Sequence, residues 1–286
     1  MTWRLDSAVV SDRGCIRELN EDSARIVRPG DDEMFARRGM LVVVADGMGG
    51  HSAGEVASQM AVETIAHAYY ELGECGESGE SRESQDSAAA LVAALQDANR
   101  AIFAHASQDR ALTGMGTTCV ALALVNGMAH AAHVGDSRLY LIRRGGIYQM
   151  TNDDSAVGEM VNRGVLSKED ARRHHDKNVI LKALGTQPDV EVSSWPAPLP
   201  LADGDAFLLC SDGLTDLVDD HELAAAVEAD ADCASVCQAL IAAAKARGGF
   251  DNITAALVRT TASATANAAP PTNIAVKDTR EWGVHS

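Results

Sequence analysis

The chain has 286 residues, of which 46% are hydrophobic and 23% charged, and its formal net charge is −17. This length and composition predict a globular protein with a substantial core rather than a disordered or fibrous chain. A chain with this negative charge repels phosphate backbones and anionic lipids, and its sequence has no dense Lys/Arg run that would offset the charge. We therefore expect no nucleic acid and no membrane among its partners.

The start of the chain and its cysteines bear on location. The first residues, Met-Thr-Trp-Arg-Leu-Asp, lack the basic and apolar regions of a signal peptide. No apolar run reaches the about 20 residues that a membrane-spanning helix needs. The six cysteines include no CxxC pair. These features predict a cytoplasmic protein with structural thiols.

The first half of the chain predicts strand and then helix. An extended stretch at 24–27 and a short apolar strand at 41–45 come first. Apolar residues then recur at helical spacing over 57–72 and over 91–102, which predicts two amphipathic helices. The Gly/Ser/Glu-rich segment 73–87 between them is typical of a solvated loop.

The second half predicts strands again. Apolar runs at 117–125, 128–134 and 138–142 are joined by short Asn-Gly and Gly-Asp-Ser links, which favour an antiparallel meander. Further strands are predicted at 206–210 and 253–259.

Late helices complete the pattern. Ser167 and Asp170 have the spacing of a capping box, and Asp220 marks a helix start. A helical stripe over 233–243 is closed by Gly248–Gly249. The whole predicts an α+β fold, an antiparallel sheet packed with helices, as one domain over residues 1–261. The Ala/Thr/Asn/Pro-rich residues 262–286 predict a disordered tail.

Acidic residues stand where predicted strands begin or end: Glu21, Asp22, Asp46, Asp136, Asp212 and Asp251. In an antiparallel sheet, the end of one strand and the start of its neighbour share an edge, so these side chains can meet at one rim. Clustered carboxylates repel one another unless a cation lies among them. Ligands that are all oxygen suit Mg²⁺ or Mn²⁺.

An Asp-Gly pair after a strand is also the strongest hairpin signal. Asp46–Gly47 and Asp212–Gly213 are each followed by a predicted helix, which weakens the hairpin interpretation there. For Asp136, which stands between two predicted strands, a hairpin and a metal ligand are equally supported. Arg17 lies just before Glu21 and suits bidentate capture of phosphate, although alone it would be an ordinary surface arginine.

Several segments together resemble a known family, the metal-dependent type-2C (PPM-class) protein phosphatases, and most closely its bacterial single-domain branch. In family order they are Arg17-Glu-Leu-Asn-Glu-Asp22, Ala45-Asp-Gly-Met-Gly-Gly-His51, Gly54-Glu55, Gly114-Met-Gly-Thr-Thr118, His133-Val-Gly-Asp-Ser-Arg138, Thr151-Asn-Asp-Asp-Ser155, Ala183-Leu-Gly185, Ser211-Asp-Gly-Leu214 and Asp251-Asn-Ile-Thr254. Each segment alone is a weak signal, but the ordered set is specific.

The resemblance implies a β-sandwich of two antiparallel sheets flanked by helices, with two Mn²⁺ or Mg²⁺ ions and a third position at one end. It implies that Asp46 bridges the two ions. The Gly47 carbonyl, and Glu21 through a water, would bind the second ion, and Asp212 and Asp251 would bind the first ion. Asp136, with Asp212, matches the third position. Asp22 would orient waters, Arg17 would bind phosphate, and Asn252 would support Asp251.

The activity implied is hydrolysis of phosphoserine and phosphothreonine on proteins by a hydroxide that bridges two metals, with no phosphoenzyme. The substrates of a cognate Ser/Thr kinase are the expected partners. Two alternatives are a catalytically weak binding module and a phosphatase of small phosphate esters.

Four places depart from the family or stay open. Met48 stands where many eukaryotic members carry a His that is the proposed general acid. His51 is either that acid or a structural helix cap. Asp154 replaces a usual His. Residues 156–178 match the family's flap, and the basic residues in it either select substrates or form a solvated face.

Overall fold

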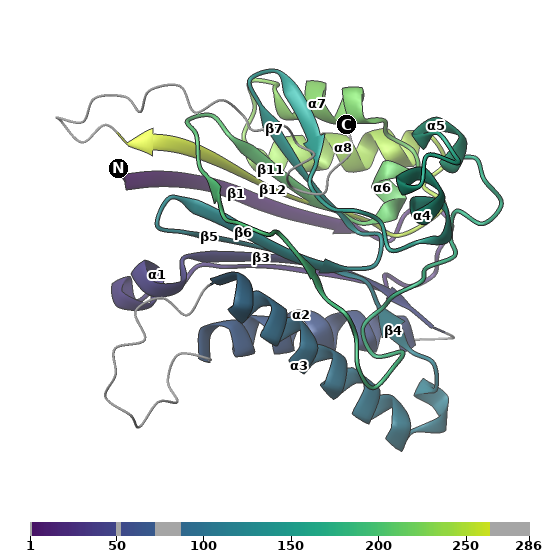
Figure 1. Ribbon diagram of the computed structural model, residues 1–286. Coiled ribbons are helices and arrows are strands. Elements are labelled where there is room, and N and C mark those ends of the chain that lie inside the picture. Colours follow the sequence, from purple (N-terminus) through teal and green to yellow (C-terminus); the bar gives the residue numbers. More distant parts are fainter. Residues whose placement is uncertain (1, 50–52, 72–86, 264–286) are drawn as a thin grey trace, which may run out of the picture.

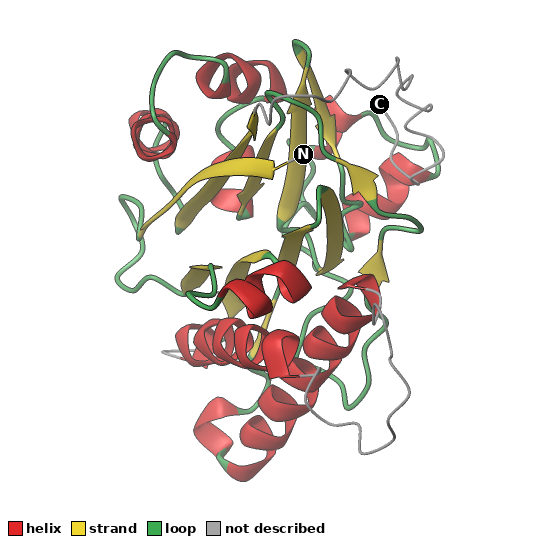
Figure 2. Cartoon of the chain, turned by 90° about the vertical axis from the view of Figure 1, so that its left-hand side faces the viewer, coloured by secondary structure: helices red, strands yellow, loops and turns green. Residues whose placement is uncertain are grey.

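The computed structural model describes residues 2–49, 53–71 and 87–263. Two antiparallel sheets lie face to face, and helices cover the outer face of each (Figures 1 and 2). The predicted α+β sandwich flanked by helices is therefore confirmed. His51, the predicted loop up to residue 86 and the tail from residue 264 lie outside the described residues.

The first sheet has the order β1-β12-β11-β7-β8. The second has the order β10-β6-β5-β3-β2, with β4 paired to β3 and β9 paired to β6. The strand bounds are β1 Thr2–Asp12, β2 Asp22–Val27, β3 Met40–Met48, β4 Gly116–Thr117, β5 Cys119–Val125, β6 Met128–Val134, β7 Arg138–Arg143, β8 Gly146–Gln149, β9 Ser193–Ser194, β10 Leu199–Pro200, β11 Ala206–Cys210 and β12 Ile253–Ser263.

The long helices α2 and α3 pack on the second sheet, and α8 packs on the first (Figure 1). The helix bounds are α1 Asp32–Arg38, α2 Ala53–Glu71, α3 Ser87–Gln108, α4 Ala156–Asn162, α5 Lys168–Ala171, α6 Asp212–Thr215, α7 Asp220–Val227 and α8 Cys233–Ala246, with a 3-10 turn η1 at Arg110–Leu112. The helices predicted from the apolar stripes are α2, α3 and α8. Ser167 caps α5, and Asp219 with Glu222 forms a capping box on α7.

The packing of strand β3 explains the unbroken apolar run at its start. Leu41, Val43 and Ala45 belong to the core beneath α2 and α3. The alternate residues Met40, Val42 and Val44 belong to the core between the two sheets. Both faces of the strand are buried, so no position alternates to a polar residue.

One predicted connection is wrong. Strand β6 pairs with β5, as the Asn-Gly link predicts, but β7 pairs with β8 and β11 in the other sheet. The three residues 135–137 therefore carry the chain from one sheet to the other instead of closing a hairpin. The sequence did not predict β1, an edge strand whose polar and apolar residues are mixed and which pairs with β12 from Thr2↔Ser263 to Asp12↔Ile253.

Candidate metal centre

The acidic residues of the sequence analysis meet at one end of the sandwich, on the side of α6 and β4 in Figure 1. On the second sheet, Asp22 at the start of β2 is the register partner of Asp46 near the end of β3. The hydroxyls of Thr117 and Thr118 hydrogen-bond the Asp46 backbone at 2.8 and 3.1 Å. Strand pairing thus fixes both aspartates on one edge.

The first sheet brings Asp212 and Asp251 to the same place through a close backbone approach. A Cβ on Gly213 would lie 2.0 Å from the carbonyl oxygen of Asn252 and 3.3 Å from Cβ of Asp251. Only glycine allows α6 to begin against the start of β12 in this way. The side chain of Asp212 in turn lies next to that of Asp46, and the two carboxyls influence each other's pKa. Acids from both sheets therefore share one cluster.

Asp22 ties the two sheets together and carries an incomplete set of hydrogen bonds. Its Oδ2 accepts hydrogen bonds from the hydroxyls of Ser211 and Thr254, both at 2.7 Å. Its Oδ1 is buried and has no hydrogen-bond partner. Burial, with the nearby charges of Asp212 and Asp251, raises the pKa of Asp22 to about 7 against the two hydroxyl hydrogen bonds.

The neighbouring carboxyls are also hard to ionise. Burial is the main cause of the raised pKa of Asp46, and repulsion from Asp22, Asp212, Asp136 and Asp251 adds to it. Burial together with Asp216 and Asp251 raises the pKa of Asp212 to about 6. Asp136 has a raised pKa through burial and the charge of Asp212. The positive charge that the described residues bring near these carboxyls therefore does not offset their burial and mutual repulsion.

Glu21 and Gly47 lie at the other side of the cluster. Burial raises the pKa of Glu21, whose Oε1 is buried without a hydrogen-bond partner. The amide of Gly47 donates to the carbonyl of Glu21 at 3.1 Å. A Cβ on Gly47 would lie 2.1 Å from the carbonyl oxygen of Gly54, so glycine is needed for α2 to begin this close to β3.

Arg17 enters the cluster from the loop between β1 and β2. Its Nη2 lies 2.7 Å from Oδ2 of Asp251, and its side chain is 48% exposed. Asn252 holds this loop: its Oδ1 accepts from the amide of Glu21 at 2.8 Å, and its Nδ2 donates to the carbonyl of Leu19 at 2.8 Å. Asn252 thus positions the Arg17 loop as well as neighbouring Asp251.

Asp136 lies in the crossover between the sheets, which removes the hairpin alternative. Gly135 has a φ of 98°, and its amide donates to Oδ2 of Asp154 at 3.1 Å. The amide of Asp154 donates back to the carbonyl of Gly135 at 2.9 Å. Asp154, the departure from the family pattern, therefore fixes the turn that presents Asp136.

This arrangement fits divalent cations. The cluster supplies carboxylate oxygens from both sheets, and two of its buried oxygens, on Glu21 and Asp22, have no hydrogen-bond partner. Positive charge there would relieve the repulsion that raises the carboxyl pKa values. Hard oxygen donors select Mg²⁺ or Mn²⁺ rather than softer metals.

Sequence reasoning assigned no role to Ser211 and Thr254, although both stand inside quoted motifs. The Ser211 hydroxyl also accepts no N-cap bond from α6, because it donates to Asp22 and accepts from the Thr254 amide at 3.0 Å. Their identity gave no signal, since a serine before a helix is ordinarily a cap and a threonine within a strand is common.

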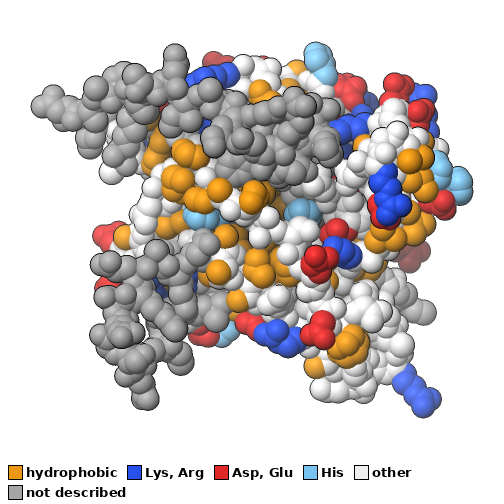
Figure 3. All heavy atoms as spheres, in the orientation of Figure 1, with side chains coloured by type: hydrophobic (Ala, Val, Ile, Leu, Met, Phe, Trp, Pro, Cys, Tyr) orange, Lys and Arg blue, Asp and Glu red, His pale blue; other side chains and the backbone are white. Residues whose placement is uncertain are grey.

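The flap, residues 156–178, borders the cluster through a cavity that Asp136 and Asp212 line together with Arg172 and Lys177. Arg172 contacts Asp220 at 2.9 Å, and Lys177 forms an ion pair with Asp216. In the space-filling view, acidic, basic and hydrophobic side chains alternate at this end of the molecule (Figure 3). Arg163 and Arg173 pair with glutamates of their own helices, as a solvated face predicts.

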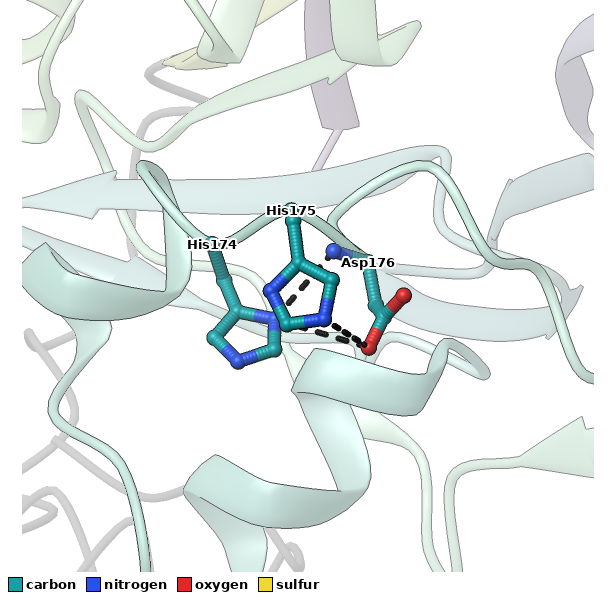
Figure 4. A group of neighbouring side chains, drawn as sticks. All are labelled: His174, His175 and Asp176. Atoms are coloured by element: carbon teal, nitrogen blue, oxygen red, sulfur yellow. Dashed lines mark hydrogen bonds and ion pairs between the residues drawn. The ribbon is translucent and has the colours of Figure 1, made fainter.

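A second group of ligand-type atoms lies on the flap, at His174, His175 and Asp176 (Figure 4). Nδ1 of His174 accepts from the Asp176 amide at 3.2 Å, and Nε2 of His175 lies 3.1 Å from Oδ2 of Asp176. The two rings stack with centroids 4.3 Å apart. The ring nitrogens and the carboxylate already contact one another, so we infer that the three residues stabilise the loop.

In the part of the chain that the structure describes, no helix is both long and apolar enough to cross a membrane.

Comparison with known proteins gives consistent matches. The family model described as Protein phosphatase 2C matches residues 22–267. The serine/threonine phosphatase stp of Listeria monocytogenes is 38% identical over 248 residues, which cover 87% of this chain and 93% of that one. The serine/threonine protein phosphatase PstP of Mycobacterium tuberculosis is 36% identical over 254 residues, covering 89% of this chain and 45% of that one.

Solved structures agree with these matches. The catalytic domain of PstP in complex with two manganese ions superposes with a TM-score of 0.75 at 35% identity, covering 91% of this chain and all of that one. Serine/threonine phosphatase Stp1 of Staphylococcus aureus gives a TM-score of 0.76 at 30% identity, covering 91% of this chain and 96% of that one.

Proposed function

Because this chain belongs to the protein phosphatase 2C family, we propose that it hydrolyses phosphate esters on serine and threonine side chains of proteins with the help of divalent metal ions. The observation that carries the proposal is the cluster of carboxyls whose pKa values are raised by burial and mutual repulsion, although Arg17 pairs with Asp251 at its edge. The PstP neighbour holds two manganese ions, which supports Mn²⁺ here, with Mg²⁺ as the alternative.

The ligand assignments follow the family pattern and the clustering of the acids. Asp46 would serve two ions. Asp212 and Asp251 would hold the first, and the Gly47 carbonyl with Glu21 would serve the second. Asp136 with Asp212 would hold a third ion. Bound ions supply Lewis acidity that lowers the pKa of water to near neutral.

The other residues position the reactants. Arg17 is half exposed, so its guanidinium can leave Asp251 and take two phosphate oxygens in a bidentate pair. Asp22 has one oxygen engaged by Ser211 and Thr254 and the other free to accept a hydrogen bond from water. Burial raises the pKa of the Cys119 and Cys210 thiols, so neither serves as a thiolate nucleophile.

Protonation of the leaving oxygen needs a donor other than Met48, which has no proton to give. The methyl group of Met48 lies near Gly116 on β4, where a Cβ would approach it to 3.2 Å. His51 and a water of the metal centre are the two candidates from the sequence.

The direct test is phosphate release from a phosphothreonine peptide with Mn²⁺, with Mn²⁺ plus a chelator, and with no metal. We expect release that the chelator abolishes. Absence of release would favour the alternative of a binding module. Rapid turnover of free phosphomonoesters with none of phosphoproteins would favour the alternative of a small-ester phosphatase.

We further propose that the substrates are those of a cognate Ser/Thr kinase, that the protein acts in signalling and that it works in the cytoplasm. The thiols of Cys15, Cys119, Cys210, Cys233 and Cys237 are free, which supports a reducing compartment. Phosphoproteomic comparison of cells with and without the gene, combined with fractionation, tests all three points.

A further inference from the structure

Three large hydrophobic side chains stay exposed on the two loops that carry Arg17 and Asp251. Ile16 is 67% exposed, Leu19 46% and Phe250 63%. Ile16 directly precedes Arg17, and Phe250 directly precedes Asp251. We call these three residues the apolar rim.

Hydrogen bonds and an ion pair hold the two loops side by side. The amide of Cys15 donates to the carbonyl of Gly249 at 2.7 Å, and Nδ2 of Asn252 donates to the carbonyl of Leu19 at 2.8 Å. The ion pair between Arg17 and Asp251, at 2.7 Å, closes the contact. The apolar rim is therefore anchored to the residues that bind phosphate and metal in the proposed function.

Phe250 is exposed but its position is constrained. A Cβ on Gly248 would lie 2.3 Å from Cζ of Phe250, so the ring rests against the backbone of Gly248, whose φ is +123°. A side chain there would displace the ring. An exposed aromatic ring held in place loses little entropy on binding a partner, which is typical of recognition residues.

We propose that the apolar rim binds hydrophobic residues that flank the phosphorylated serine or threonine of a protein substrate. This inference rests on the proposed function, because phosphate bound by Arg17 would place the phosphoresidue next to Ile16. An extended chain advances about 3.3 Å per residue, so the neighbouring one or two residues reach the rim. The formal net charge of −17 disfavours acidic flanking residues and attracts basic ones at long range, whereas direct contact with the exposed side chains of the apolar rim selects apolar neighbours.

The test compares wild type, Ile16→Ser, Phe250→Ser and the double variant with three substrates and Mn²⁺. Two substrates are phosphothreonine peptides that differ only in having leucine or serine on both sides of the phosphoresidue. The third is p-nitrophenyl phosphate, which has no flanking residues. Val9→Ser is the matched control, because Val9 is a 37% exposed hydrophobic residue on β1, outside both loops.

Wild type should have a higher kcat/KM for the leucine peptide than for the serine peptide. In the double variant, a higher KM should lower kcat/KM for the leucine peptide by about 5–20-fold. The ratio of the kcat/KM values for the two peptides should then be close to one. Turnover of p-nitrophenyl phosphate and the unfolding midpoint should not change. Equal turnover of both peptides by wild type, or an unchanged kcat/KM ratio in the double variant, would overturn the proposed role of the apolar rim but not the proposed function. Wild type that hydrolyses neither peptide would instead overturn the proposed function.

Discussion

Strand β11 has an aspartate close to each end, and the two lie in opposite surroundings. Asp205, just before the strand, is fully buried and receives Arg143 in a bidentate pair, with both distances 2.6 Å, and the amide of Ala202 at 2.7 Å. Asp212, just after the strand, lies among other carboxyls, and burial raises its pKa to about 6.

The charged partners of each aspartate indicate whether it stabilises the fold or serves the site. A buried carboxylate with a complete set of charged partners serves the fold, and removing either partner leaves an uncompensated charge. A cluster of carboxyls whose neighbours offset little of their charge is unfavourable to the fold on its own and is retained where a cation or substrate completes it. The two ends of β11 should therefore respond oppositely to mutation.

The largest expected effect is on turnover at the acidic end. Asp46→Ala or Asp251→Ala should lower kcat on a phosphothreonine peptide by at least about 10³-fold, because the ions lose a ligand that other groups cannot replace. Circular dichroism should show a folded protein. Near wild-type activity in either variant would contradict the assignment of that residue.

The opposite end should show a loss of stability instead. Asp205→Ala leaves Arg143 buried without its charged partner, so the free energy of unfolding should fall by about 3–5 kcal/mol in a urea titration. The folded fraction should retain wild-type kcat at low temperature. If the variant unfolds like wild type, the contrast between the two ends of β11 does not hold.

A smaller effect concerns pH in the presence of a chelator. The pKa of Asp22 is raised from 3.8 to about 7 in the folded protein, so folding is penalised increasingly as pH rises from about 4 to 7 and fully above 7. Asp22→Asn removes this penalty and can still accept from Ser211 and Thr254.

The metal-free Asp22→Asn variant should therefore be more stable than wild type by about 1–3 kcal/mol at pH 8, with the advantage shrinking toward pH 5. Urea unfolding at several pH values measures it, and Ser11→Ala serves as a control in which only hydroxyl hydrogen bonds are lost. An advantage independent of pH would show that charge at Asp22 is not the cause.

The smallest effect should come from Asp154, which supports the crossover without joining the acid cluster. Asp154→Ala leaves the Gly135 amide without its partner and should cost about 1 kcal/mol in stability. We expect kcat to fall only a few-fold, since Asp136 is displaced rather than removed. A loss as large as that of Asp46→Ala would mean that Asp154 itself takes part in the reaction.

Much of this protein was determined by local sequence. Helical spacing of apolar residues predicted α2, α3 and α8, because a helix buried along one stripe has apolar residues at that spacing. Unbroken apolar runs predicted β3, β5, β6, β11 and β12, because a strand buried on both faces has apolar residues at successive positions. The positions of Asp46, Asp212 and Asp251 at strand ends, with the ordered motifs, predicted the residues of the acidic cluster.

The tertiary structure decided what depends on contacts between distant segments. The step from β6 to β7 changes sheet, although its Gly-Asp-Ser link is short enough for a hairpin, because β7 pairs with β11, a strand far along the chain that the local sequence does not indicate as its partner. The same holds for the pairing of Asp22 with Ser211 and Thr254 across the two sheets. A sequence records which side chains are buried or polar, whereas the partner of each buried polar atom is set only when both sheets have packed.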